Sequence, residues 1–191
     1  VPPGPLPVGA AVQRVRERAD LGLRRIGAVD RRLGHRPIGR GKFDTLAVTS
    51  SSQGVIARAH PLPEVELDDL LRRRKGVAPF LLALDGVTDP QNLGAVLRSA
   101  ECAGVTGIIL PRHRAVHVTP SVAKAAAGAI EYLPMTLVGG LPAALARLRE
   151  RGAWVVGLDG DAPTSLYGLP IAEEPIVLVL GAEGKGLREL T

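Results

Sequence analysis

The sequence predicts an α/β domain whose parallel sheet is covered by helices on both faces. Four short apolar runs, at residues 80–84, 107–110, 154–158 and 176–180, have the length and continuity of strands that are buried on both sides. Stretches with helical spacing of apolar residues lie between or beside them, at residues 92–103, 120–130 and 141–151. Strands that alternate with helices are typical of a parallel sheet.

The first 78 residues have a different texture and are interpreted as two further regions. Residues 1–45 form a basic N-terminal segment in which Val12, Val15, Ala19 and Leu23 are spaced for a short amphipathic helix, with a solvated basic arm as the equal alternative. Residues 46–78 form a connector with a strand-like stretch at 54–57 and a short helix near its end. We therefore divide the chain into residues 1–45, 46–78 and 79–191, the last being the α/β domain.

Composition narrows the class of protein. The chain of 191 residues carries a formal net charge of +5, which favours a polyanionic partner because Lys and Arg neutralise phosphates. A lone cysteine, Cys102, excludes an intramolecular disulfide, and no signal peptide or apolar run of about 18 residues is present. We therefore expect a cytoplasmic protein without a membrane-spanning segment.

Polar residues follow the predicted strands, where parallel sheets place their ligands. After the first strand, Asn92 is positioned either to cap the next helix or to face a ligand, and Gly94 would let a bulky group approach the first turn. Arg98 comes six residues after Asn92 and therefore lies on a different helix face, unless Asn92 precedes the helix. The spacing alone leaves open a capping Asn92 and a surface Arg98.

A glycine-rich segment, residues 181–186, follows the last strand. Its glycines allow close approach of the backbone to a ligand, but it matches neither the Walker A loop nor the G-x-G-x-x-G fingerprint, and a turn with a solvated Glu183 and Lys185 is the alternative. No G-x-S-x-G elbow is present for a hydrolase. His113 and His117 lack the H-E-x-x-H arrangement, so we expect no metal site.

Two long motifs resemble the signatures of the SpoU–TrmH family of RNA ribose methyltransferases. They are residues 85–100, DGVTDPQNLGAVLRSA, and residues 178–187, LVLGAEGKGL. Residues 52–57, 118–129 and 154–157 resemble the branch that methylates a guanosine of large-subunit ribosomal RNA, although a His is commoner at Ser52. The resemblance covers roughly residues 46–191.

The resemblance implies a SPOUT-type trefoil-knot α/β fold, a homodimer, and transfer of a methyl group from S-adenosylmethionine to a ribose 2′-hydroxyl of RNA. It implies that Asn92, Arg98 and Glu183 are the catalytic residues and that the backbone at Leu180 and Gly181 lines the cofactor pocket. The basic segment 1–45 is then interpreted as the remnant of a small RNA-binding domain. A non-catalytic RNA-binding relative is the alternative.

The family has a third signature, with Ser and Asn residues, beyond the position that corresponds to Thr191. We therefore expect residues 79–191 to lack the C-terminal motif, so that these residues alone form an incomplete knot and bind the cofactor weakly. Arg98 stays protonated, so its expected role is to hold an RNA phosphate and stabilise the nascent alkoxide, with Glu183 orienting Arg98 or Asn92.

Overall fold

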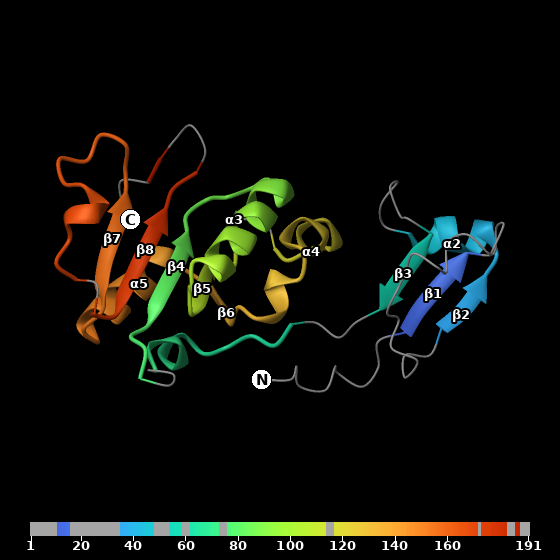
Figure 1. Ribbon diagram of the computed structural model, residues 1–191, viewed down its shortest axis with the longest axis horizontal. Helices are drawn as coiled ribbons and strands as arrows, with labels where there is room; N and C mark the ends of the chain where they lie inside the picture. The colour runs from blue at the N-terminus through green and yellow to red at the C-terminus, as the bar shows by residue number, and fades with distance from the viewer. Residues whose placement is uncertain are drawn as a thin grey trace. The chain divides into compact units, whose positions relative to one another are not determined.

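The computed structural model describes residues 11–15, 35–47, 54–58, 62–72, 76–113, 117–171, 173–182 and 186–187 (Figure 1). The chain divides into two compact units, residues 1–62 and residues 63–191. The division falls inside the predicted connector, and each unit is described by itself.

The first unit contains a three-stranded sheet. Strand β1 (Ala11–Val15) lies between β2 (His35–Ile38), to which it is parallel, and β3 (Val55–Arg58), to which it is antiparallel. Helix α2 (Arg40–Leu46) buries Phe43. The helix predicted from Val12 onward is wrong for residues 11–15: strand pairing on both sides outweighs a helical spacing of so few positions. The later residues of that predicted helix lie outside the described residues.

The second unit contains five parallel strands in the order β6-β5-β4-β8-β7. The strands are β4 (Phe80–Leu84), β5 (Gly107–Pro111), β6 (Met135–Val138), β7 (Trp154–Leu158) and β8 (Ile176–Leu180). The four strands predicted from apolar runs are confirmed. Strand β6 was missed because its four residues, MTLV, include a polar threonine and form too short a run to separate from a loop.

Helices cover both faces of this sheet, as predicted (Figure 1). On one face, α5 (Leu141–Glu150) and the 3-10 helix η1 (Leu67–Leu71) pack on alternate strand residues such as Leu81, Ala83, Val177 and Val179. The other face carries α3 (Pro90–Cys102) and α4 (Pro120–Ala126), with the 3-10 helices η2 (Ala129–Glu131) and η3 (Leu166–Gly168) in the loops.

Helix α4 is shorter than predicted. The pattern predicts a helix over 120–130, but the chain leaves the helical conformation at Ala127 and Gly128, whose φ angles are 51° and 94°. Two consecutive left-handed residues end an α-helix, and the chain then resumes as η2. Gly128 supplies this conformation without strain.

The segment before η1 extends the sheet at its β6 edge. The Val65 N–H donates to the Met135 carbonyl at 2.9 Å, and Glu64 forms an ion pair with Arg112 at 3.1 Å. Next along the chain, Asp68 of η1 accepts from Arg147 at 2.6 Å and lies 2.9 Å from Arg151, both at the end of α5. Residues 64–68 are therefore part of the α/β unit.

Candidate active site

A cavity of about 650 Å³ opens at the carboxyl ends of β4 and β8. Its walls come from the loop after β4, the first turns of α3 and the residues that follow β8. Among the residues predicted for the site, Asn92, Leu180 and Gly181 line this cavity. The structure therefore brings together one predicted catalytic residue and both predicted cofactor-binding residues at the sheet edge where an α/β fold places ligands.

The start of α3 determines how Asn92 is presented. Asp89 is the N-cap, with its carboxylate accepting from the Gln91 N–H at 2.8 Å, and Pro90 takes the first helical position. Asn92 lies inside the first turn on the exposed side, so the alternative that it caps the helix is wrong. From this first turn Asn92 lines the cavity.

Gly94 serves packing between helices. A Cβ on this buried glycine would overlap the Cβ of Ala125 and the backbone of Ala126 in α4. The expectation that Gly94 admits a ligand is therefore wrong, because α4 occupies that space. The glycine lets α3 and α4 approach closely, which fixes the position of the helix that carries Asn92.

Arg98 lies apart from Asn92. Both residues are exposed on α3, but six residues along an α-helix correspond to about 9 Å along its axis and about 120° around it. Ala95 and Val96, one turn after Asn92, line the cavity, and Arg98 does not. Within one copy of the chain, the structure does not bring Arg98 to the cavity at Asn92.

A closed turn follows β8. The Ala182 N–H donates to the Gly186 carbonyl at 3.0 Å, and the Gly186 N–H donates to the Ala182 carbonyl at 2.9 Å. A Cβ on Gly181 would collide with the backbone of Gly186 and Leu187, so Gly181 is required by the return of the chain. Glu183, the third predicted catalytic residue, lies outside the described residues.

Sequence reasoning missed several cavity residues. Val87, Thr88, Ala95 and Val96 line it. Ala95 and Val96 follow Asn92 at i+3 and i+4, so the helical period would have found them once the helix start was known. Val87 and Thr88 belong to an irregular loop, for which no periodic signal exists.

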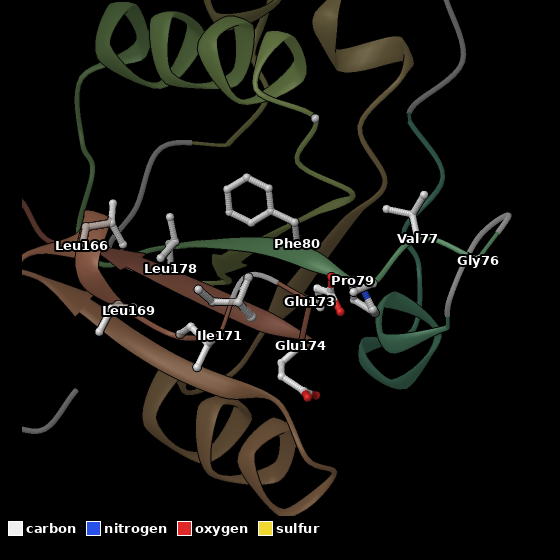
Figure 2. Close-up of a pocket in the computed structure, with 13 residues that line it drawn as sticks. Gly76, Val77, Pro79, Phe80, Leu166, Leu169, Ile171, Glu173, Glu174 and Leu178 are labelled. Carbon is white, nitrogen blue, oxygen red and sulfur yellow. The ribbon is translucent and has the colours of Figure 1, made fainter.

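A second and larger hollow, of about 830 Å³, lies at the opposite end of the sheet. Figure 2 shows Phe80 and Leu178 from β4 and β8 facing Leu166 and Ile171 from the segment after β7. The lining is mostly apolar, with Glu173 and Glu174 contributing carboxylates, and contains none of the predicted site residues.

No group of three His, Cys, Asp or Glu residues within the described ranges is arranged to hold a metal ion. In the same part of the chain, no helix combines the length and apolar character needed to span a bilayer.

The comparison with protein families shows to which family of proteins the chain belongs. Residues 79–191, more than half of the chain, match the SpoU rRNA Methylase family. The chain belongs to this family. The match covers both motifs and the whole sheet from β4 to β8, and it confirms the resemblance found in the sequence.

Curated relatives of this SpoU family member are 23S rRNA (guanosine-2′-O-)-methyltransferases. The protein of that name from Pseudomonas aeruginosa is 49% identical over 142 residues, covering 73% of this chain and 56% of the relative. The one from Shewanella oneidensis is 45% identical over 155 residues, covering 80% of this chain and 62% of the relative. The chain thus spans less than two thirds of the length of these relatives.

Solved structures show the same fold. The SpoU methyltransferase AviRb from Streptomyces viridochromogenes, in complex with AdoMet, has a TM-score of 0.69 at 21% identity, over 93% of this chain and 67% of that one. An AdoMet-bound rRNA methyltransferase from Sinorhizobium meliloti has a TM-score of 0.69 at 22% identity, over 94% and 67%. The predicted α/β class with a covered parallel sheet is confirmed.

Proposed function

We propose that the protein transfers a methyl group from S-adenosylmethionine to the ribose 2′-hydroxyl of a guanosine in large-subunit ribosomal RNA. The observation that carries this proposal is the meeting of both family motifs at one cavity, where Asn92 of the first lies with Leu180 and Gly181 of the second. The activity for which the Pseudomonas and Shewanella relatives are named supports this choice of substrate. Ribosomal RNA as substrate also supports a cytoplasmic location.

The cavity fits S-adenosylmethionine in size and lining. Its volume of about 650 Å³ is within the range of small-molecule sites, about 300–1,000 Å³. Leu180, Gly181 and Ala182 offer a wall in which the side chains are small or absent at two of three positions, so backbone groups can face a ligand. S-adenosylmethionine supplies a methyl group on a sulfonium, which needs no further activation.

The residues of the chain then have to position the ribose and stabilise charge. A ribose hydroxyl is a poor nucleophile at neutral pH, so negative charge that grows on its oxygen must be met by a fixed cation or donor. Arg98 is proposed to hold an RNA phosphate and stabilise this oxygen, Asn92 to fix the geometry of the loop at the cavity, and Glu183 to orient one of them. The proposed chemistry requires no metal ion.

The distance between Asn92 and Arg98 supports the proposed homodimer. One α3 helix cannot present both side chains to one cavity, since they lie about 9 Å apart along the axis and about 120° around it. If α3 of a second copy lies across the first, Arg98 of one copy can serve the cavity of the other. We therefore propose a homodimer with shared sites, and a trefoil-knotted fold.

The first unit is proposed to contact RNA. In the sequence, residues 1–62 carry eleven Lys and Arg residues against four Asp and Glu residues. Such an excess favours phosphate binding, with an affinity that falls as the salt concentration rises. This supports the interpretation of residues 1–45 as the remnant of a small RNA-binding domain.

The proposal is tested with the protein expressed from its own gene. Calorimetry should detect binding of S-adenosylmethionine, and ribosomal RNA from cells that lack the gene should accept a methyl group at a guanosine 2′-oxygen. Arg98→Ala should abolish transfer and leave the unfolding midpoint unchanged. Near-wild-type turnover of that variant would refute the assigned role, and RNA binding without any transfer would favour the non-catalytic alternative.

A further inference from the structure

The lining of the cavity at the carboxyl ends of β4 and β8 divides by exposure. Val96, Leu180 and Gly181 are half-buried and carry no polar side chain. Asp89 and Asn92 are exposed and polar. Among the lining residues that the structure describes, only Asp89 is charged. The exposed side of the cavity, which an RNA substrate would reach first, therefore carries a carboxylate.

The charge of Asp89 is more than the helix cap requires. Its Oδ1 accepts from the Gln91 N–H at 2.8 Å, but Asn, Ser and Thr make the same hydrogen bond about as well. The positive end of the α3 dipole favours a negative charge only weakly at an exposed position. Against this, the carboxylate repels the phosphates of an RNA that approaches the cavity. A carboxylate at this position therefore needs a partner in the substrate that carries hydrogen-bond donors.

The base of the substrate nucleotide is such a partner. Proteins that recognise RNA sequences bind the Watson–Crick edges of unstacked bases. On that edge guanine carries two adjacent donors, its N1–H and its 2-amino group, and a carboxylate carries two acceptor oxygens and no donor. Adenine and cytosine place an acceptor nitrogen beside their amino group, and uracil flanks its N–H with two carbonyl oxygens. A carboxylate is therefore complementary to guanine and meets a repelling acceptor on each of the other bases.

The start of α3 holds this carboxylate close to the proposed site of methyl transfer. Asp89 is the N-cap and Asn92 is the third helical residue, and these two positions are neighbours in the first turn. Pro90 restricts the residue before it to extended backbone, and Asp89 has φ −83° and ψ 124°. The carboxylate is therefore presented to the cavity from a rigid turn.

We propose that Asp89 is a specificity-determining residue. Its carboxylate binds the N1–H and the 2-amino group of guanine when the 2′-hydroxyl of the same nucleotide lies in the cavity beside Asn92. The inference rests on the proposed function and deepens it, because it names the residue that selects the base.

The test uses Asp89→Asn, in the protein expressed from its own gene. Asn caps a helix as well as Asp does, so this variant removes the charge and keeps the hydrogen bond from the Gln91 N–H. Asp159→Asn is the matched control, because Asp159 is also exposed and its Oδ1 accepts from the N–H two residues further on, that of Asp161, at 3.0 Å, outside the cavity lining. Asp89→Ser, which also caps, replaces Asp89→Asn if the latter does not fold.

The substrates are two large-subunit ribosomal RNAs that differ in one base. One carries guanosine at the position that the wild type methylates, and the other carries inosine there, introduced by ligation. Inosine keeps the N1–H and lacks the 2-amino group, so it removes one of the two proposed donors. The quantities measured are kcat/KM for methyl transfer to each RNA, the dissociation constant for S-adenosylmethionine, and the unfolding midpoint.

Wild type and Asp159→Asn should prefer guanosine to inosine about tenfold or more, the effect of losing a hydrogen bond to a charged group. Asp89→Asn should lower kcat/KM for guanosine by a similar factor and should prefer guanosine by less than about twofold. Its affinity for S-adenosylmethionine and its unfolding midpoint should stay close to those of wild type, because the cap is kept.

Equal rates of the wild type on both RNAs would overturn the inference. So would an undiminished preference for guanosine in Asp89→Asn, which is the result that a purely structural cap predicts. A wild type that methylates no guanosine in the unmodified RNA would instead refute the proposed function, and the inference with it.

Discussion

Gly94 of α3 lies directly against Ala125 of α4, so closely that no side chain fits between them. The contact sets the separation of the two helices on one face of the sheet. Through it, α4 holds in place the helix whose first turn carries Asn92 into the cavity. A glycine in the first family motif is thus explained by packing.

Gly94→Ala should lower the free energy of unfolding by about 1–3 kcal/mol, the usual cost of overpacking a close contact, even though Ala is the better helix former. Urea unfolding would measure it. Gly160→Ala is the matched control, since the space around Gly160 is open and its φ is not positive. An equal effect at both positions would contradict the packing account.

Asn92→Ala should reduce methyl transfer strongly and change the free energy of unfolding by less than about 0.5 kcal/mol, as expected for an exposed position that is not the helix cap. Asp89→Ala removes the cap and should cost about 1 kcal/mol. Unfolding curves and turnover measured on the same preparations would separate the two roles. A larger loss of stability in Asn92→Ala than in Asp89→Ala would contradict this assignment.

Subunit mixing tests the shared site. Homodimers of Asn92→Ala and of Arg98→Ala should each be inactive. In a mixed dimer, one cavity loses both groups and the other keeps both, so co-expressed chains should regain activity. Absence of any activity in purified mixed dimers would show that Arg98 serves the cavity of its own copy. Mixing Arg98→Ala with Arg98→Lys provides the control, because no cavity then keeps an arginine.

Asp68 should make stability depend on pH. Its hydrogen bond from Arg147 lowers the pKa of Asp68, opposed by burial and assisted by the charges of Arg147 and Arg151. A lowered folded pKa stabilises the protein above the unfolded value of about 3.9, and the contribution disappears as the pH falls through the folded pKa. The urea midpoint of wild type should therefore exceed that of Asp68→Asn at pH 7, and the gap should close below about pH 4. A gap that does not depend on pH would refute this.

Asp68 also predicts a response to salt. The side chains of Arg147 and Arg151 are 55% and 54% exposed, so dissolved ions screen their charges. Within the described residues, its Oδ1 is buried and accepts no hydrogen bond, so the stabilisation depends on Oδ2. The difference between wild type and Asp68→Asn at pH 7 should shrink in molar salt.

Sequence patterns predicted most of the α/β unit because its strands are continuous apolar runs. The four strands centred on Leu82, Ile109, Val156 and Leu178 were predicted at nearly their observed bounds. The same holds for helices α3 and α5, whereas α4 was predicted four residues too long. Strands β1 and β2 were not predicted, because their pairing joins residues that are far apart in the chain. No local period encodes such pairing.

The candidate site was predicted less completely than the fold. Their positions after strands made Asn92 and Gly181 candidate site residues. The helix cap at Asp89 and the contact of Gly94 with Ala125 could not be predicted in the same way, because they depend on where α3 begins and on what packs against it. The burial of Asp85, at the start of the first motif, was not predicted, because the burial of a residue at a strand end depends on segments that are distant in the chain. Arg98 was predicted to lie on a different helix face from Asn92, and α3 does place the two residues on different faces.

The hydrogen bond from Val65 to Met135 shows that the folding unit begins before the region that matches the family. The family match begins at residue 79, yet the outer edge of β6 is covered by the segment that begins at residue 63. A chain that begins at Pro79 would lose the ion pair between Asp68 and Arg147 of α5. It would also expose the backbone of β6, and an exposed strand edge can pair with another molecule. Residues 63–72 thus shield a strand edge that would otherwise be open to pairing, and a shortened version of the α/β unit should begin no later than Pro63.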